Sequence, residues 1–526
     1  MKNASSSWVP PITPHFSQRT ARFIKNPATK PLHESAPSFK PTKQSNPLFK
    51  SWKPPPPKWA EWVDQMAGKH SAVWIKSGIF DPIMSSIYEI PCNNDLISEL
   101  SRFWTPKSNT FVLFPWKEEV TITLEDVTIL GGFSVLGDPV DVDDDGIVVS
   151  IPDLAGKVEV MKEFRSELVR GRSKKASHSK WIEKFMKSEH EQEHEHEIEH
   201  VAFLSLWLSR FAFPSGDQDS VGKHVFPMAA RLSRGVKLAL GPAILAYIYR
   251  SLTRLKEQSV GSDSNRCVNL FGPFQLVQIW GYERFPDIGP KTPNELRPGE
   301  PRLARWHGLK PEVSVPRLEG FIWRPYVVDL QNWKQPLYYQ DYDQILSDSL
   351  TLDDDLRSFV RFITPCELDG LGFKAKYHPH RVAMQFGFDQ DIPGDVCSTK
   401  SSEFVNFFVP SRSFRPGVSK RYSDWWKNVD QMGVQKDQDS SVGERINASV
   451  EFRKFDHKDC GKNCDFDFVD LTIEDGFDDV LVRLKKICDD TKRKIDSLKE
   501  SKIGAPRSKK LRSELGSDTI DVIIID

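Results

Sequence analysis

The sequence lacks an apolar stretch long enough to cross a bilayer. The apolar run at 201–213 is interrupted by Arg210, whereas a membrane-spanning helix needs about 18 such residues. An excess of charge is also missing, because 72 basic residues face 73 acidic ones and the net charge is −1. No overall field therefore attracts nucleic acid or a membrane surface, and such contacts need a local patch. We expect a soluble, intracellular protein without a membrane partner.

Cysteine and familiar catalytic motifs are scarce as well. The seven cysteines are scattered and odd in number, which favours a reducing compartment over a disulfide framework. The sequence has no phosphate-binding Gly-x-x-x-x-Gly-Lys-Ser/Thr loop and no Gly-x-Ser-x-Gly elbow. It also has no dinucleotide-binding Gly-x-Gly-x-x-Gly between a strand and a helix. These absences predict no cofactor and none of the common enzyme classes.

What is present predicts one large helical domain with flanking segments. The 33 Phe and 15 Trp can build an extensive core, and apolar residues recur at helical spacing from residue 58 to about 430. Residues 1–57 are rich in Pro, Ser and Lys and carry Glu34 as their only acid, so we expect disorder there. The predicted fold class is mainly α.

Two further parts of the chain are predicted to lie outside the core. Residues 141–200 resemble a charged insertion, which we expect to be poorly ordered. Residues 431–475 have the composition of a polar linker. Residues 476–500 predict a helix, whose short apolar seam over 478–499 favours either weak self-association as a coiled coil or docking on the main domain. The tail at 501–526 is basic and then apolar and acidic.

Three groups of residues match metal sites by letter only. Acids within 141–146 follow the first half of a calcium loop, but Pro152 stands where the closing Glu belongs. HEQEH at 190–194 and HEIEH at 196–200 spell a zinc-protease motif without the apolar back face that holds such a helix under a cleft. The third group is His457, Cys460 and Cys464, which has no obvious fourth ligand. We predict no metal site, and solvated charged surface is the preferred interpretation.

The stretch TITLEDVTILGGFSVLGDPV at 121–140 organises the domain. Thr123 and Asp126 have capping-box spacing for a helix over 124–130, and Gly131-Gly132 is a stop signal. This stretch strongly resembles the signature of the plant mobile domain, a transposon-related family often labelled aminotransferase-like. The resemblance continues in other segments of the chain: SGIFDPI, SRFW, NTFVLFPW, FQLVQIWGYERFP, FVRFITPCELDGLG, YHPHRVAMQFGFDQDIPG and YSDWW.

The resemblance implies a non-enzymatic nuclear regulator, domesticated from a mobile element, that acts in gene or transposon silencing and in meristem or plant development. No recognisable pyridoxal-phosphate lysine supports aminotransferase activity. The alternative is a metal-dependent nuclease or transposase-like enzyme remnant, with a metal held by acids such as Asp126, Asp138 and Asp369. Three carboxylates within roughly 5 Å of one point would support that alternative.

One group in the main domain has the composition of a contact site. It consists of Tyr377, His378, His380 and Arg381. Aromatic, imidazole and guanidinium groups can stack on and pair with nucleic acid or bind a partner. Alternatively, they form buried hydrogen bonds that support Phe386. The second interpretation is favoured, because no stripe of Lys and Arg accompanies the group to contact phosphates.

The C-terminal tail carries two interaction motifs. Two basic clusters separated by twelve residues match the paired grooves of an import receptor and predict nuclear localisation: Lys492, Arg493, Lys494, Arg507, Lys509, Lys510 and Arg512. The terminal DTIDVIIID closely resembles a SUMO-interacting motif, in which the strand-forming residues are Val522, Ile523, Ile524 and Ile525. The alternatives are pairing with an edge of the protein's own domain or an unstructured end. The predicted partners are nuclear proteins, with SUMO or sumoylated proteins among them.

Overall fold

The computed structural model assigns structure to the central part of the chain. It describes residues 47–50, 52–113, 118–140, 152–170, 174–186, 193–214, 219–260, 268–310, 320–339, 344–346, 354–392, 407–409 and 415–426. Contacts divide the chain into residues 1–447 and 448–526, and every described residue belongs to the first unit. The predicted linker, C-terminal helix and tail therefore lie outside the described residues.

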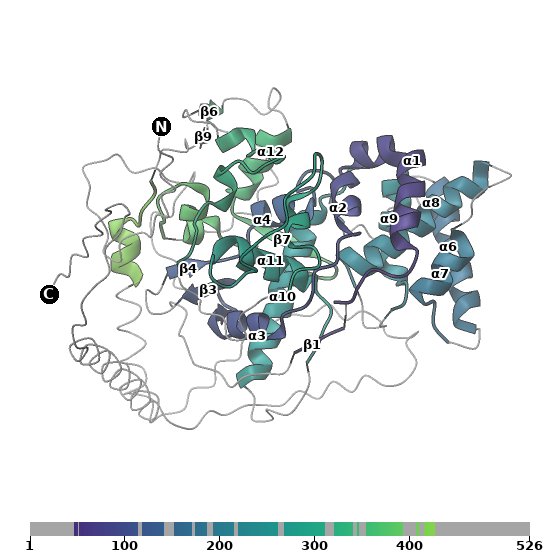
Figure 1. Cartoon of the computed structure of the whole chain (residues 1–526), viewed down its shortest axis with the longest axis horizontal. Coiled ribbons are helices and arrows are strands. Elements are labelled where there is room, and N and C mark those ends of the chain that lie inside the picture. Colours follow the sequence, from purple (N-terminus) through teal and green to yellow (C-terminus); the bar gives the residue numbers. More distant parts are fainter. Residues whose placement is uncertain are drawn as a thin grey trace, which may run out of the picture. The chain divides into compact units, whose positions relative to one another are not determined.

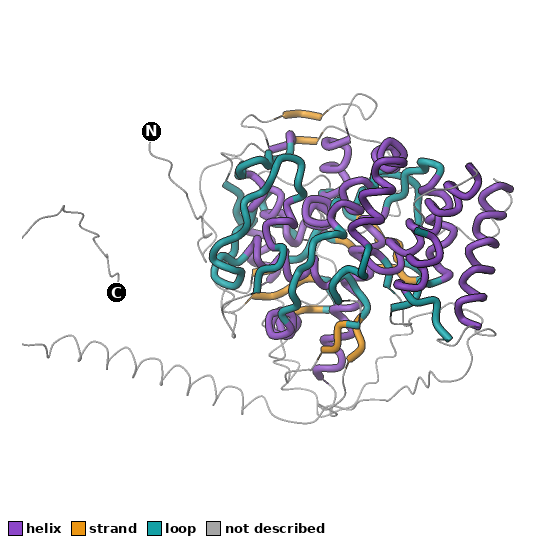
Figure 2. The backbone as a smooth tube through the Cα atoms, turned by 45° about the vertical axis from the view of Figure 1, so that its right-hand side comes forward, coloured by secondary structure: helices purple, strands orange, loops and turns teal. Residues whose placement is uncertain are grey.

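The described chain is mainly helical, as the sequence predicts (Figure 2). The helices are α1 (Trp59–Ser77), α2 (Phe80–Ser85), α3 (Asn94–Phe103), α4 (Leu124–Gly131), α6 (Pro152–Arg170), α7 (His178–Phe185), α8 (Glu193–Trp207), α9 (Phe226–Ser233), α10 (Leu240–Val260), α11 (Phe274–Arg284) and α12 (Asp354–Phe362). Shorter helical turns separate some of them, and the π-helical turn η1 (Leu208–Ala212) directly follows α8. No described helix is long and apolar enough to span a membrane.

Strands are short and form small sheets between the helices. The strands are β1 (Pro47–Phe49), β2 (Trp104–Thr105), β3 (Thr110–Leu113), β4 (Glu118–Val120), β5 (Val268–Leu270), β6 (Gln344–Leu346), β7 (Cys366–Gly370), β8 (Phe373–Tyr377) and β9 (Phe407–Val409). Among the described residues, β2, β3 and β4 form an antiparallel sheet, and β7 pairs antiparallel with β8. The two remaining pairs are β6 with β9 and β1 with β5.

Helix α10 occupies the middle of the domain (Figure 1). Its predicted apolar stripe is buried along its whole length: Ile244, Leu245, Ile248, Leu252 and Leu255. The helix contacts α4, α3, β2, β5, β7 and β8, so one stripe organises elements from both halves of the sequence. Burial of that stripe supplies much of the hydrophobic stabilisation that a helix needs to persist in water.

A group of helices consisting of α1, α6, α7, α8 and α9 packs together on the right of Figure 1. Its centre is aromatic. The ring of Phe203 on α8 stacks on Trp59 with centroids 4.9 Å apart and on Trp74 with centroids 5.3 Å apart, both from α1. Trp62 meets the same ring edge-on at 5.1 Å. The tryptophans at helical spacing in the sequence therefore mark the face of α1 that contacts α8.

The predicted disorder of residues 141–200 is wrong for most of that segment. It forms α6, α7 and the first half of α8. The reason is that these helices have an apolar face, although the segment as a whole is rich in charged residues. The buried residues of that face are Leu154, Val158, Met161, Trp181 and Ile182. Helix α6 packs on α9, and α7 packs on α8. Residues 141–151, including the calcium-loop match, lie outside the described residues.

The predicted disorder of residues 1–57 is wrong for its last part. Strand β1 pairs in parallel with β5, with Phe49 opposite Leu270. Phe49 is buried and meets Phe274 at 4.9 Å, and the indole nitrogen of Trp52 donates to the carbonyl oxygen of Ile90 at 2.7 Å. Two large aromatic side chains hold this proline-rich stretch against the domain. Residues 1–46 lie outside the described residues.

Candidate functional site

The signature helix α4 is fixed at both ends, as its sequence predicts. The Oγ1 of Thr123 accepts from the backbone nitrogen of Asp126 at 3.3 Å, and Asp126 Oδ2 accepts from the backbone nitrogen of Thr123 at 2.8 Å. This is a complete capping box. At the other end Gly132 adopts a left-handed conformation with φ 73°. The Thr-Leu-Glu-Asp-Val sequence is therefore a buried structural element.

Asp126 also forms an ion pair in the interior. Its Oδ1 lies 2.6 Å from Arg284 Nη2 of α11, and both side chains are at most 1% exposed. The hydroxyl of Tyr326 donates to the same oxygen at 2.7 Å. The guanidinium of Arg284 donates in addition to the backbone oxygen of Trp323. One carboxylate thus joins α4, α11 and the segment at 323–326, and the pairing compensates the cost of burying each charge.

Glu125 lies beside this ion pair and has a different environment. It is fully buried, and the hydroxyl of Tyr338 donates to its Oε1 at 3.1 Å. Burial and the neighbouring Asp126 raise the pKa of Glu125 to about 7, while Arg284 and the tyrosine hydroxyls oppose the rise. Burial thus favours the protonated form of this carboxyl more than it is favoured in an exposed glutamate. Such a shift is typical of catalytic acids and also of structural networks.

A second buried carboxylate, Glu283, precedes Arg284 on α11. Its Oε2 lies 2.8 Å from Arg302, its Oε1 lies 3.1 Å from Arg305, and the indole nitrogen of Trp306 donates to Oε1 at 3.0 Å. Burial alone would raise the pKa of Glu283, but Arg302 and Arg305 outweigh burial and lower it. The pair Glu283 and Arg284 therefore ties both sides of α11 to distant segments.

The candidate contact group at 377–381 is inside the domain. Tyr377, His378, His380 and Arg381 are at most 6% exposed. The Nε of Arg381 donates to both carboxylate oxygens of Glu119 at 3.0 and 3.1 Å, and Tyr422 donates to Glu119 at 2.7 Å. Side chains this deeply buried have no face for nucleic acid, so the surface-contact interpretation is wrong. The alternative of buried hydrogen bonds is the one that the structure has.

The three acids named for the enzyme alternative each pair with a different basic residue. Asp126 is paired with Arg284, Asp138 lies 2.8 Å from Arg231, and Asp369 lies 3.7 Å from Lys374. Within the part of the chain that the structure describes, no group of three or more His, Cys, Asp or Glu side chains could hold a metal ion. The three acids therefore do not form the arrangement on which the enzyme alternative was based.

The described end of the His and Glu run, from His196 to His200, is part of the helix packing. Glu197 lies 2.7 Å from Lys157 and 3.2 Å from Arg234. His200 accepts a hydrogen bond from the indole nitrogen of Trp74 at 2.9 Å and stacks on His70 with centroids 3.8 Å apart. Burial lowers the pKa of His200 well below its ordinary value. The HEIEH match is therefore a helix face turned partly toward α1 and α6 and differs from the predicted solvated surface.

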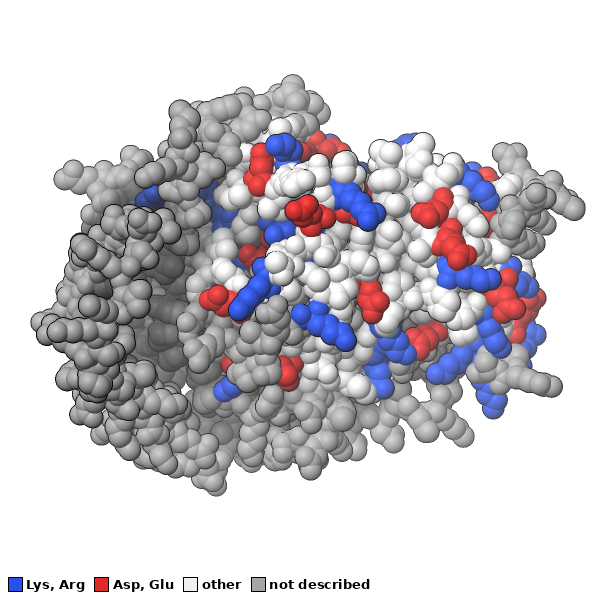
Figure 3. Space-filling model, viewed as in Figure 1, with Lys and Arg blue, Asp and Glu red and all other residues white. Residues whose placement is uncertain are grey.

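Surface charge shows no single sign on the face drawn in Figure 3, where acidic and basic side chains alternate. Ion pairs between opposite charges are also found at exposed positions, such as Lys374 with Glu367 at 3.0 Å and Lys237 with Asp354 at 2.6 Å. The predicted nuclear-localisation residues, the SUMO-like residues at 522–525 and the group at His457, Cys460 and Cys464 lie outside the described residues.

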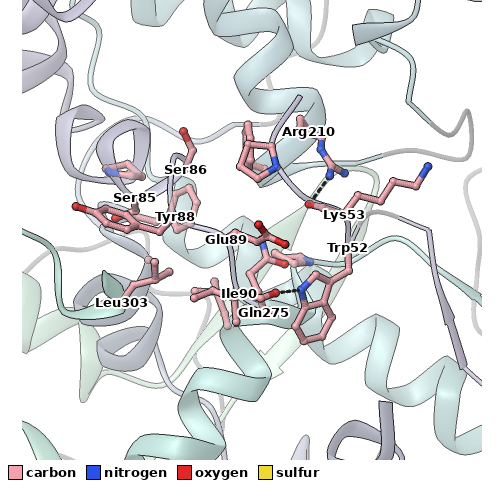
Figure 4. A pocket seen from close by; sticks show the side chains of 17 residues that line it. Trp52, Lys53, Ser85, Ser86, Tyr88, Glu89, Ile90, Arg210, Gln275 and Leu303 are labelled. Carbon is pink, nitrogen blue, oxygen red and sulfur yellow. Dashed lines mark hydrogen bonds between the residues drawn. The ribbon is translucent and has the colours of Figure 1, made fainter. Parts of the chain in front are cut away.

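A small cavity opens between α2, η1 and the proline-rich stretch after β1 (Figure 4). Its volume is about 60 Å³. Its lining includes Trp52, Ser85, Tyr88, Phe133, Arg210 and Leu276, and we name it the Arg210 cavity. Arg210 Nη2 donates to the backbone oxygens of Lys53 at 2.7 Å and Pro54 at 3.2 Å. The cavity combines aromatic walls with a buried guanidinium.

The fold is a mainly helical domain whose signature carboxylates are buried in a network of arginine and tyrosine side chains. Comparison with family models shows that the chain belongs to the plant mobile domain family, whose model matches residues 78–427. This match confirms the predicted resemblance over more than half of the chain. No solved structure matches the chain significantly.

Several curated Arabidopsis thaliana proteins are similar to the chain. Protein MAINTENANCE OF MERISTEMS is 28% identical over 326 residues, which are 60% of this chain and 61% of the relative. Protein MAIN-LIKE 1 is 29% identical over 222 residues, 41% of this chain and 40% of the relative. A serine/threonine-protein phosphatase 7 long form homolog is 24% identical over 339 residues, 59% of this chain and 23% of the relative. The chain thus spans less than two thirds of each relative's length.

The sequence did not reveal the partners of the signature acids or the Arg210 cavity. Arg284 lies 158 residues from Asp126, and Tyr338 lies 213 residues from Glu125. A usable signal was present in α11, where Glu283 and Arg284 are the charged residues of an otherwise uncharged helix and therefore require buried partners. The cavity has no comparable signal, because its lining comes from separate, individually ordinary segments.

Proposed function

We propose that this protein is a non-enzymatic regulatory protein of the plant nucleus that acts in gene or transposon silencing and in meristem development. The observation that carries the proposal is that the acidic residues of the family signature are buried and bonded inside the domain. Glu125 and Asp126 hold Tyr338, Arg284 and Tyr326 together inside the domain. Charged residues committed to internal pairing support a role as an interaction scaffold, whose surface and flanking segments make the contacts.

Similarity to MAINTENANCE OF MERISTEMS supports the developmental part of the proposal. Nuclear proteins are the proposed partners, and SUMO or sumoylated proteins bind the tail at 522–525. The basic clusters at 492–494 and 507–512 provide nuclear entry. Self-association through 478–499 is weak and assists multivalent binding. No cofactor takes part.

The test is genetic complementation in the source plant. We expect loss of the gene to disturb meristem organisation and to raise transcripts of mobile elements, and the wild-type protein to restore both. Glu125→Gln keeps a hydrogen-bond acceptor for Tyr338 but removes the ionisable carboxyl, so a scaffold should retain its activity with this variant. A mutant plant with normal meristems and silent mobile elements would contradict the proposal. Loss of rescue with a folded Glu125→Gln protein would support the enzyme alternative.

A further inference from the structure

The Arg210 cavity has apolar walls and a limited volume. Trp52, Phe133 and Leu276 supply aromatic and aliphatic surface, and Tyr88 adds a ring whose hydroxyl donates to Glu300 at 3.1 Å. A volume of about 60 Å³ accommodates about four water molecules or a short organic molecule. Small-molecule sites in proteins have this composition, with mostly apolar walls and few polar groups.

Ser85 places a hydroxyl without a partner in the lining. The side chain is 7% exposed, and its buried Oγ has no hydrogen-bond partner. The adjacent Ser86 differs, because its Oγ accepts from the indole of Trp59 at 3.0 Å and donates to the backbone oxygen of Ile83 at 2.5 Å. A buried hydroxyl left unsatisfied lowers stability, so its presence beside a cavity points to a ligand that accepts its hydrogen bond.

The opposite side of the cavity is cationic. In Figure 4 Arg210 and Lys53 lie across from Ser85 and Tyr88. Arg210 is 6% exposed and belongs to the π-helical turn η1, a geometry often found at functional sites. Lys53 pairs with Asp219 at 2.5 Å and points its ammonium away from the other lining side chains in Figure 4. Glu89, an exposed lining residue, lies between the two sides. The buried charge in the lining is therefore positive and disfavours a cation such as a methylated lysine.

We propose that the Arg210 cavity binds a short carboxylic acid that carries a second hydrogen-bond acceptor, such as an oxo or hydroxy acid. The carboxylate faces Arg210, the carbon chain lies against Trp52 and Phe133, and the oxo group accepts from the Ser85 hydroxyl. A polypeptide C-terminus carries the same two groups, a carboxylate and a carbonyl oxygen. A small oxo or hydroxy acid and a polypeptide C-terminus therefore offer the cavity the same pair of groups.

Calorimetric titration of the full-length protein with a matched series of acids tests this site. The probe is 4-oxopentanoate. Pentanoate lacks the oxo group, and 4-oxopentanamide lacks the charge. We expect 4-oxopentanoate to bind with a Kd of about 1 mM and each matched compound to bind at least about fivefold more weakly. N-acetylglycine imitates a polypeptide end, and tighter binding of it than of 4-oxopentanoate assigns the site to a protein C-terminus.

Ser85→Ala separates a binding role from a structural one. We expect this variant to bind 4-oxopentanoate only as tightly as it binds pentanoate, and its affinity for pentanoate to equal that of the wild type. Its Tm should rise by about 1–2 °C because an unsatisfied hydroxyl is removed. Ser101→Ala is the matched control, since that buried hydroxyl donates to the backbone oxygen of Ser98 at 2.7 Å. It should lower the Tm and leave binding unchanged. No binding at about 20 mM, or equal binding by the amide, overturns the proposal.

Discussion

Glu125 is expected to make the stability of the domain depend on pH. Burial and Asp126 raise its pKa in the folded protein to about 7 from an ordinary value of 4.5. Between these values the unfolded chain has lost a proton that the folded chain retains. Stability is therefore highest below pH 4.5 as far as this group is concerned, and it falls by about 3 kcal/mol as the pH rises to about 7.

Glu125→Gln should flatten this decline, because glutamine keeps an acceptor for Tyr338 and does not ionise. The measurement is urea unfolding at steps between pH 5 and about 8, with the difference between variant and wild type plotted against pH. Glu367→Gln is the control, since Glu367 is exposed and pairs with Lys374 on the surface. Parallel curves for wild type and Glu125→Gln would show that Glu125 ionises normally.

Arg381 provides a second prediction, about charge burial. Arg381→Met leaves the carboxylate of Glu119 buried without its cation and should lower the free energy of unfolding by about 3–5 kcal/mol. Adding Glu119→Gln should recover part of the loss. Lys374→Met breaks an exposed pair and should cost less than about 1 kcal/mol. Chemical denaturation measures all of these variants, and a small effect of Arg381→Met would mean that water reaches Glu119.

At the scale of elements, the end of α4 depends on a glycine. Gly132 has φ 73°, and a Cβ there would lie 2.8 Å from the backbone nitrogen of Pro82. Gly132→Ala should therefore lower the free energy of unfolding by about 2 kcal/mol or more. Gly68→Ala is the matched control, because Gly68 lies within α1 with nothing within 4 Å of its Cβ position. That change should stabilise by about 0.5–1 kcal/mol in thermal unfolding.

The terminal segment DTIDVIIID is a predicted strand that needs a partner. Its apolar residues cannot form a core alone, so we expect a peptide covering 513–526 to add a strand to an edge of SUMO. Because the peptide must be ordered on binding, the affinity should be micromolar, about −7 to −8 kcal/mol. Amide shifts of labelled SUMO measure binding, and Ile523→Ala with Ile524→Ala should abolish them. Absence of shifts at millimolar peptide would reject the motif.

Local signals in the sequence predicted individual elements well. The capping residues Thr123 and Asp126 predicted both the start and the burial of α4, and one apolar stripe predicted α10. Pairing between elements was not predictable, because helical periodicity shows which face is buried and leaves its partner open. Asp126 therefore looked like a candidate metal ligand, although Arg284 neutralises it. Charge-rich composition likewise concealed the buried face of α6.

At the scale of the whole molecule, the tail is expected to determine location. Replacing Lys492, Arg493, Lys494, Lys509 and Lys510 with Ala should move a fluorescent fusion from the nucleus to the cytoplasm, because both basic clusters are needed by the import receptor. The matched control replaces five basic residues of the segment 141–200 with Ala: Lys162, Lys174, Lys175, Lys180 and Lys184. Microscopy should show that the control stays nuclear. Nuclear accumulation of the tail variant would show that another signal suffices.

Helix α1 has a consequence for where the domain begins. The family model begins at residue 78, yet Trp59, Trp62 and Trp74 of the preceding helix cover the ring of Phe203. A fragment that begins at residue 78 would lack the three rings that cover Phe203 and would expose the aromatic core. The part of the chain that must be present for this core to be covered is therefore longer than the segment that the family model matches.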